Sequence, residues 1–244
     1  MLPLNAWQPL YGRLLMKTIG LIGGLSWESS KEYYRIINES VNQKVGGLHS
    51  AKCIVYSLDF GEAMETKNSK GWNQLVEVLI DTARKLETAG ADFVLICTNT
   101  MHKFVPEIQR AIRVPILHIA DTAAKRVLEK RLRRVGLLGT RMTMEEDFYK
   151  ERMKKFGIDV IVPEKEEMDF IDSVIFKELC IGKINASSRE KFMEIIERLA
   201  ENGAEGIILG CTEIPLLIRQ EDVSVPIFDT TSIHAESAVE FALK

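Results

Sequence analysis

Short runs of apolar residues alternate along the chain with longer segments in which apolar residues recur at every third or fourth position. The apolar runs are 18–23, 53–58, 93–96, 114–119, 135–139, 158–162, 206–210 and 225–228. In the segment 72–90, Leu75, Leu79 and Leu86 lie on one face of an expected helix. Buried strands that alternate with amphipathic helices predict an α/β fold with parallel sheets covered by helices on both faces.

The two halves of the chain resemble each other. The segment KTIGLIGG is similar to RRVGLLGT, and AGADFVLICTN is similar to NGAEGIILGCTE. Gly20 and Gly136 lie 116 residues apart, and Cys97 and Cys211 lie 114 residues apart. Several similar pairs at nearly one offset predict two similar βα domains related by an approximate two-fold axis, with the active site in the cleft between them.

The limits of these domains follow from the same pattern. The first strand begins just after Met16, so we expect residues 1–15 to be an N-terminal extension; they also lack the features of a signal peptide. Residues 16–116 together with 226–244 are expected to form the first domain. Residues 117–225 are expected to form the second.

Two of the four cysteines occupy equivalent places in the repeat. Cys97 and Cys211 each follow an expected strand directly, and ligands of open parallel sheets bind beyond the carboxyl ends of strands. A helix is expected to begin just after each cysteine, which would favour the thiolate. Cys53 and Cys180 lack this context and are expected to be core or helix-face residues.

Two thiols on opposite sides of a small substrate form an acid–base pair. One thiolate removes a proton from carbon, and the other thiol returns a proton to the opposite face, which inverts the stereocentre. The developing negative charge needs hydrogen-bond donors around the substrate carboxylate. The candidates are Asn99, Thr100, Thr140 and Thr212.

Four segments carry a resemblance to a known family. TIGLIGG, SWES, CTNTMHK and GCTEI resemble the cofactor-independent aspartate/glutamate racemases, and more closely their broad-specificity amino-acid racemase branch. The resemblance extends from Met16 to Lys244. It implies two similar α/β domains, an amino acid substrate bound between them, no pyridoxal phosphate or metal, and a homodimer.

The resemblance also implies roles for single residues. Cys97 and Cys211 match the two acid/base cysteines, and the polar candidates named above match contacts of the substrate carboxylate or ammonium group. Glu213 occupies the place of a histidine in glutamate racemases and is a candidate proton relay. The loop DFGEAMETKNSKGW lacks the arginine of aspartate-specific members, with Lys67 and Lys70 as substitutes, so we expect a wider range of amino acids.

Composition excludes several other classes of protein. The 32 Lys and Arg residues nearly balance the 35 Asp and Glu residues, so no broad basic face for nucleic acid is expected. The cysteines include no CxxC pair, which leaves a zinc site without support and indicates reduced thiols in the cytoplasm. No run of about twenty apolar residues predicts a membrane span. The segment GLIGG does not match the dinucleotide-binding pattern.

Alternatives to amino-acid racemisation remain at this stage. The same pair of thiols suits cis–trans isomerisation of a small dicarboxylate or racemisation of a hydantoin, because fold and thiols do not fix the substrate. A non-catalytic protein that binds a ligand or senses oxidants through its thiols is a different class of function. The histidines show no metal-ligand spacing; His102 is expected either to touch the cleft or to bond locally.

Overall fold

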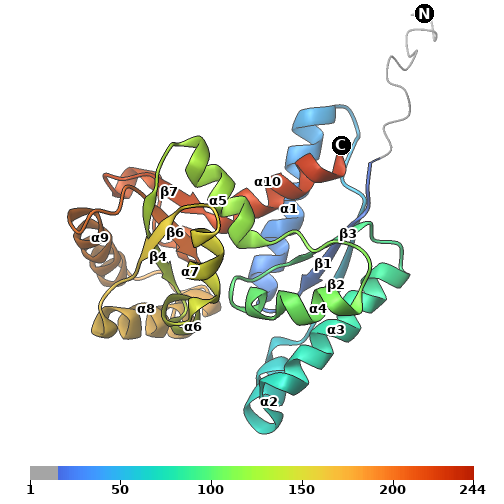
Figure 1. Ribbon diagram of the computed structural model, residues 1–244, viewed down its shortest axis with the longest axis horizontal. Coiled ribbons are helices and arrows are strands. Elements are labelled where there is room, and N and C mark those ends of the chain that lie inside the picture. Colours follow the sequence, from blue (N-terminus) through green and yellow to red (C-terminus); the bar gives the residue numbers. More distant parts are fainter. Residues whose placement is uncertain (1–15) are drawn as a thin grey trace, which may run out of the picture.

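The computed structural model describes residues 16–244, so the expected extension 1–15 lies outside the described residues. Two lobes are each built on a parallel sheet (Figure 1). The strands are β1 (Ile19–Gly23), β2 (Cys53–Ser57), β3 (Phe93–Ile96), β4 (Arg134–Gly139), β5 (Asp159–Ile161), β6 (Ile207–Gly210) and β7 (Ile227–Asp229). Their order is β2-β1-β3 in the first sheet and β5-β4-β6-β7 in the second, which confirms the predicted fold class.

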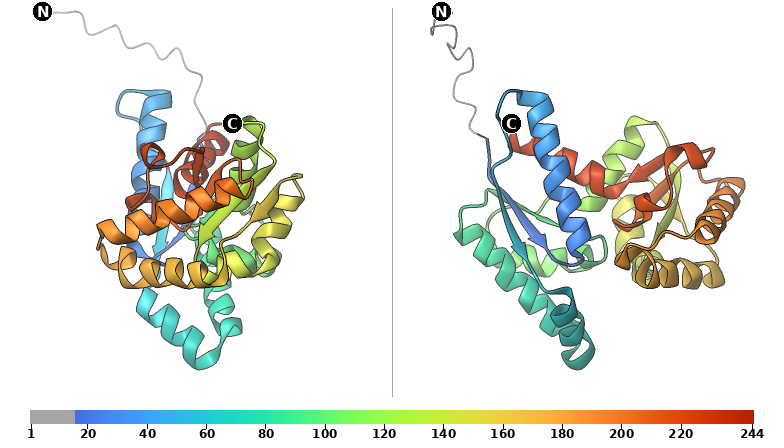
Figure 2. Two further views of the ribbon diagram at one scale, coloured as in Figure 1. Left: turned by 90° about the vertical axis from the view of Figure 1, so that its left-hand side faces the viewer. Right: turned by 180° about the vertical axis from the view of Figure 1, so that it is seen from behind.

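Helices cover both faces of each sheet (Figure 2). The α-helices are α1 (Trp27–Val45), α2 (Phe60–Lys70), α3 (Trp72–Thr88), α4 (Val105–Ala111), α5 (Ile119–Glu129), α6 (Arg141–Glu145), α7 (Asp147–Lys154), α8 (Lys165–Lys177), α9 (Ala186–Glu201) and α10 (Thr230–Ala242). Short 3₁₀ helices are η1 (Thr100–Phe104), η2 (Leu179–Ile181), η3 (Ile214–Leu216) and η4 (Gln220–Asp222).

The register of the strands next to the cysteines differs by one residue between the lobes when Gly20 is aligned with Gly136. In the first sheet Ile22 of β1 pairs with Ile96 of β3, and Cys97 follows. In the second sheet Gly139 of β4 pairs with Gly210 of β6, and Cys211 follows. Because Ile22 corresponds to Leu138, which pairs with Leu209, Cys97 corresponds to Gly210 and Thr98 corresponds to Cys211. The lobes repeat the same βα pattern, but the prediction that the two cysteines hold equivalent positions is wrong by one residue.

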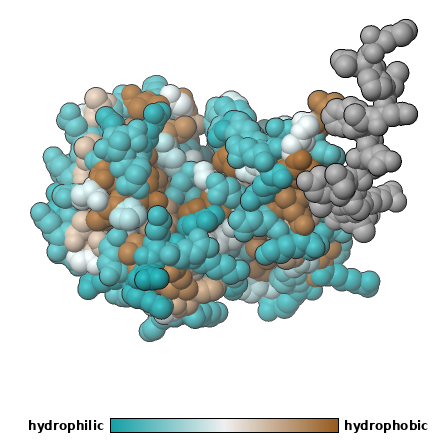
Figure 3. All heavy atoms as spheres, turned by 90° about the horizontal axis from the view of Figure 1, so that it is seen from above, coloured by the Kyte–Doolittle hydropathy of each residue, from teal (hydrophilic) through white to brown (hydrophobic). Residues whose placement is uncertain are grey.

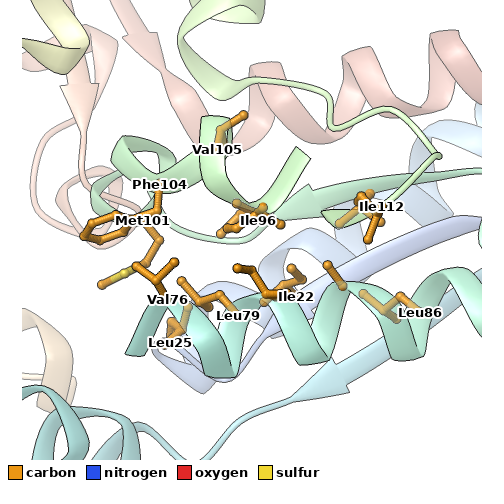
Figure 4. Close-up of a cluster of buried hydrophobic side chains, with 14 of the residues drawn as sticks. Ile22, Leu25, Val76, Leu79, Leu86, Ile96, Met101, Phe104, Val105 and Ile112 are labelled. Carbon is orange, nitrogen blue, oxygen red and sulfur yellow. The ribbon is translucent and has the colours of Figure 1, made fainter. Parts of the chain in front are cut away.

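The core shows why the strands are continuous apolar runs. Ile22 packs on the face covered by α3 and α4, whereas its neighbour Leu21 packs on the face covered by α1 and α10. Figure 4 shows Leu79 of α3 beside Ile22, with Ile96 of β3 close by. A strand that is buried on both faces needs apolar side chains at successive positions, so it lacks the alternation of a half-exposed strand.

The amphipathic pattern of 72–90 corresponds to α3. Leu75 and Leu79 are completely buried, and the exposed positions between them carry polar side chains. The helix ends before Gly90. The backbone of Gly90 has a φ of +96°, which residues other than glycine rarely adopt. The predicted helix and its end are both confirmed.

The segments 114–119 and 225–228 differ, although both were expected to be strands. Around Ile116 the chain forms only an isolated bridge to Val94, because the His118 side chain accepts a bond from the Ala120 N–H and starts α5. The second segment continues as β7, which pairs with β6 of the second sheet. The expectation that residues 227–229 group with the first domain therefore disagrees with their sheet.

Helix α10 connects the lobes at the end of the chain. It begins directly after β7 in the second lobe and packs along α1 of the first lobe (Figure 1). Residues 230–242 thus contact α1 of the first expected domain and α5 of the second. Where the domain boundary should be drawn remains a prediction.

The outside of the molecule is largely polar on the face seen in Figure 3, where hydrophobic residues appear in scattered areas. Within residues 16–244, no helix combines the length and the apolar character that crossing a bilayer requires.

Candidate active site

A cavity of about 280 Å³ lies between the two lobes. Its wall comes from both halves of the chain, and it includes the loops that follow β3 and β6. The lining residues of the first half are Leu25, Ser26, Phe60, Met64, Lys67, Trp72, Thr98, Asn99, Thr100 and Met101. Those of the second half are Thr140, Arg141, Met142, Asp172, Ile175, Phe176, Cys180, Gly210, Cys211, Thr212 and Glu213.

All but one of the residues predicted for the site lie in this wall. The six that do are Asn99, Thr100, Thr140, Cys211, Thr212 and Glu213. Cys97 is completely buried and does not line the cavity, whereas the three residues that follow it do. The structure thus brings the polar candidates together with one of the two cysteines, and places the other just behind the wall.

Cys211 has a carboxylate as its direct neighbour. Its Sγ donates a hydrogen bond to Glu213 Oε2 at 3.0 Å, and the Thr212 hydroxyl donates to the same oxygen at 2.7 Å. Burial, reinforced by the negative charge of Glu213, raises the pKa of Cys211 well above its usual range. The thiol is therefore held in its protonated form beside a group that can accept its proton.

Cys97 is held by its backbone in an apolar environment. Its N–H donates to the Ile22 carbonyl at 2.9 Å, and the Ser29 hydroxyl donates to the Cys97 carbonyl at 2.7 Å. The side chain belongs to the buried cluster that includes Tyr33 and Leu95. Burial raises the pKa of the Cys97 thiol above its usual range.

The expected helices after the cysteines are short. Thr100 begins the five-residue 3₁₀ helix η1, and Ile214 begins the three-residue η3. A helix of this length sums few peptide dipoles, so burial outweighs it at both thiols. Burial raises the pKa of both thiols and thus opposes the thiolates that the helix ends were expected to favour.

Three threonine hydroxyls meet where the lobes face each other. Thr100 Oγ1 lies 3.1 Å from Thr140 Oγ1 and 3.3 Å from Thr143 Oγ1, and the last two lie 3.1 Å apart. Thr100 comes from the first lobe, and Thr140 and Thr143 come from the start of α6 in the second. Each hydroxyl has one proton and two lone pairs, so the group can donate to an anion by rotating its protons. Thr143 was missed in the sequence, where its three-residue spacing from Thr140 was the available signal.

One side of the cavity is a helix face that the sequence analysis did not assign to the site. Asp172 and Phe176 of α8 and Cys180 of η2 line the wall at a spacing of four residues. Burial, with a contribution from the charge of Glu213, raises the pKa of Cys180 to about 12. The expectation that Cys180 is a core or helix-face residue therefore omitted its contact with the cavity.

The cations of the cavity wall differ in their partners. The Arg141 guanidinium pairs with Glu145 and Asp169, and its backbone N–H donates to Asp172 at 2.7 Å. The half-buried Lys67 places its Nζ 5.2 Å from the centre of the Trp72 ring. Lys70 is exposed and does not line the cavity. Of the two lysines considered as substitutes for the missing arginine, only Lys67 lies at the site.

His102 bonds locally and does not line the cavity. Its Nδ1 lies 2.7 Å from the Thr98 carbonyl, and its ring packs against those of His118 and His234 with centroids 4.7 and 5.6 Å away. Burial lowers the pKa of His102 to about 4 and that of His234 to about 3, so both are neutral. Across residues 16–244, no three His, Cys, Asp or Glu side chains are grouped to hold a metal ion.

The fold and the cavity together define an α/β protein of two similar lobes with a small-molecule site between them. A family model described as "Asp/Glu/Hydantoin racemase" matches residues 22–238, and the chain belongs to this family. The match covers both lobes and every residue of the cavity wall, so the family applies to the whole of the site.

Individual relatives agree with this family. The broad specificity amino-acid racemase RacX of Bacillus subtilis is 27% identical over 167 residues, which cover 68% of this chain and 72% of that protein. The structure of an aspartate racemase homologue from Pyrococcus horikoshii is 39% identical, with a TM-score of 0.83, and covers 94% of this chain and 100% of that one. A crystal structure from Yersinia pestis, described as that of a candidate Asp/Glu racemase, is 46% identical with a TM-score of 0.88, and the match covers 94% of this chain and 100% of that one.

Proposed function

We propose that this protein racemises free amino acids by two proton transfers at Cα, with Cys97 and Cys211 as the acid/base pair. The proposal is supported by the positions of the two cysteines directly after β3 and β6: Cys211 lines the cavity, and Cys97 precedes the lining residues Thr98, Asn99 and Thr100. A reaction that inverts a carbon centre needs a proton donor and a proton acceptor on opposite faces, and a two-fold repeat supplies such a pair.

In one direction the reaction begins at Cys211. Glu213 takes the Cys211 proton, and the thiolate then removes the Cα proton; the electron pair of the broken C–H bond delocalises into the substrate carboxylate. The Cys97 thiol donates its proton to the opposite face of Cα, which leaves Cys97 as the thiolate. The ammonium group of the substrate brings a positive charge into the cavity and lowers the raised pKa values of both thiols.

The polar residues of the wall bind the two charged groups of the substrate. Thr100 and Thr140 can direct their hydroxyl protons toward the substrate carboxylate, where negative charge grows in the transition state. Thr212 and Asn99 complete the polar part of the wall. Cys97 lies behind this wall, so the proposal includes a movement of residues 97–100 that brings its thiol to the substrate.

The remaining wall favours a broad range of side chains. It is largely apolar, with Phe60, Met64 and Trp72 on one side and Met142 and Ile175 on the other. Unbranched methionine side chains can rearrange around ligands of different shape. Lys67 adds a positive charge to the side of the wall formed by Met64 and Trp72, so the proposed range of substrates includes acidic amino acids.

Two other functions use the same thiols. Racemisation of a hydantoin, or cis–trans isomerisation of a dicarboxylate, would place a different substrate in the same cavity. A thiol-sensing protein would need only one reactive thiol, so a second cysteine next to the cavity has no role in it. The paired arrangement therefore favours proton transfer over sensing.

The experiment that tests the proposal incubates the protein with each single L-amino acid in D2O. We expect deuterium at Cα and formation of the D-enantiomer for several substrates, followed by mass spectrometry and chiral chromatography. C53S is the matched control, because Cys53 begins β2 and does not line the cavity, and it should match the wild type. The absence of Cα exchange across the whole panel would refute amino-acid racemisation. If the protein converted only a hydantoin or a dicarboxylate, the corresponding alternative function would take the place of amino-acid racemisation.

The assembly and location are also part of the proposal. The family resemblance leads us to propose a homodimer in the cytoplasm. Light scattering coupled to size exclusion tests the assembly: twice the mass of one chain is expected, and a monomer at all concentrations would contradict it.

A further inference from the structure

Thr230, the first residue of α10, is completely buried and forms two hydrogen bonds through one hydroxyl group. Its Oγ1 donates to the Leu209 carbonyl at 2.7 Å, and Asn99 Nδ2 donates to the same Oγ1 at 3.0 Å. Leu209 lies two residues before Cys211, and Asn99 lies two residues after Cys97. A single side chain outside the cavity wall therefore connects the loop after Cys97 with the end of β6, which precedes Cys211.

The fold explains why this hydroxyl is in place. β7 ends at Asp229, which is opposite Leu209 in the register of β6 and β7, so Thr230 follows where the ladder stops. The Asp229 carboxylate accepts from the Thr231 N–H and starts α10. Thr230 is thus fixed between the end of a strand and the start of a helix, and its hydroxyl bonds the Leu209 carbonyl.

The two hydrogen bonds of the Thr230 hydroxyl determine which end of the Asn99 side-chain amide, NH₂ or oxygen, faces Thr230. A carbonyl can only accept, so the single hydroxyl proton of Thr230 goes to Leu209, and only lone pairs remain for Asn99. Asn99 must therefore present its NH₂ group to Thr230. Its Oδ1 is buried and has no hydrogen-bond partner among residues 16–244, although Asn99 lines the cavity. An oxygen without a partner at this position is available to an N–H donor of the substrate.

We propose that Thr230 is a positioning residue that fixes the orientation of Asn99, so that Asn99 Oδ1 accepts a hydrogen bond from the substrate ammonium group. This inference rests on the proposed function for the identity of the ligand. The orientation of the Asn99 amide does not depend on the proposed function, because it follows from hydrogen bonds within the protein.

Three variants separate this role from a general effect on folding. T230V keeps the shape and removes the hydroxyl, whereas T230S keeps the hydroxyl and removes a methyl group. T231V is the matched control, because the adjacent Thr231 is also buried and its Oγ1 forms no hydrogen bond in the described part of the chain. A role in packing alone would affect T230S and T231V as much as T230V.

The first measurement needs no activity. In ¹⁵N-labelled protein, the side-chain amide protons of Asn99 should exchange slowly with solvent in the wild type, T230S and T231V. At least one of them should exchange about tenfold faster in T230V, because a buried hydrogen bond protects it. Equal protection in T230V and the wild type would overturn the proposal, whatever reaction the protein catalyses.

The second measurement uses the amino acid that the D2O panel identifies. T230V should raise KM about tenfold, the size expected for one hydrogen bond to a charged group, with a smaller change in kcat. N99A combined with T230V should be no worse than N99A alone, because Thr230 acts through Asn99. Additive losses would overturn this role. If the wild type exchanges no Cα proton at all, the proposed function fails, and the amide exchange still decides the role of Thr230.

Discussion

The loops after β3 and β6 each hold a cysteine, and the two cysteines lie in different environments. Cys97 precedes by one residue the position that corresponds to Cys211; it is completely buried in an apolar cluster, whereas Cys211 lies in the cavity wall. Only Cys211 donates its thiol proton to a carboxylate, that of Glu213. The repeat thus places both cysteines near a strand end, and a shift of one residue together with the neighbouring side chains makes their environments different.

This difference assigns unequal tasks to the two thiols. Burial raises the pKa of both, so both rest as thiols, and the thiol beside Glu213 has a proton acceptor at 3.0 Å. Cys97 depends on the substrate and on a movement of its loop. In the proposed mechanism the two thiols therefore have different requirements.

The largest effect is expected from removing the acceptor. E213Q keeps the size of the side chain but cannot take the Cys211 proton, so kcat/KM should fall by about 10²–10³-fold. The decrease in kcat/KM should be the same with the L- and the D-enantiomer as substrate, because the equilibrium constant of racemisation is one. E221Q is the control, since Glu221 is exposed on η4 away from the cavity. Unchanged racemisation in E213Q would remove Glu213 from the mechanism.

The histidines near the Cys97 loop should make the protein sensitive to acid. In the folded state burial lowers the pKa of His102 to about 4, below the unfolded value of about 6.5. The neutral form is therefore favoured by folding, and this stability is complete above pH 6.5 and is lost as the pH falls toward 4. The loss for His102 is on the order of 3 kcal/mol.

Urea unfolding at several pH values between 7 and 4 measures this loss. The non-titrating variant H102N separates it from the titration of carboxylates, because its unfolding free energy should fall less over the same range. Equal falls in H102N and the wild type would show that His102 contributes nothing to the acid sensitivity.

The sequence predicted the framework of this comparison better than its details. The apolar runs and the repeat located β3 and β6, because strand ends and repeats are local patterns, but the offset of 114 residues placed Cys97 one residue from the position that corresponds to Cys211. The burial of Cys97 was not predictable in the same way, since it depends on Tyr33 of α1 and on α10. Packing between distant segments leaves no pattern next to the cysteine.

The same distinction explains the other differences. Asn99, Thr100, Thr140 and Thr212 follow strands directly and were found from their positions. Cys180 follows α8, and the direction of that helix in the fold brings Cys180 to the cavity. The residues next to Cys180 in the sequence do not reveal this, so Cys180 was expected to be a core or helix-face residue. The strand expected at 114–119 is a single bridge because His118 starts a helix there, and a short apolar run does not reveal such a cap.

Thiol labelling should distinguish the two cysteines directly. Without substrate, iodoacetamide should modify Cys211 about tenfold faster than Cys97, because Cys211 lies in the cavity wall and Cys97 is completely buried. Mass spectrometry of the peptides gives the two rates. Equal rates would show that the Cys97 loop opens in the absence of substrate.

The smallest effect is expected at Cys180, which lines the cavity together with Cys211. Cys180 has no equivalent in the first lobe and no place in the proton transfers, so C180S should change kcat/KM by about threefold at most. A larger loss, in a variant with unchanged unfolding free energy, would mean that Cys180 takes part in the reaction and that the account based on two thiols is incomplete.

The most direct test of the central claim follows Cα deuteration of each enantiomer in C97S and C211S. Each variant keeps one thiol, which can reach only one face of Cα. We predict that neither variant interconverts the enantiomers, and that C97S and C211S exchange the Cα protons of opposite enantiomers. Racemisation at the wild-type rate in either variant, or exchange of the same enantiomer by both, would contradict the assignment of two opposed thiols.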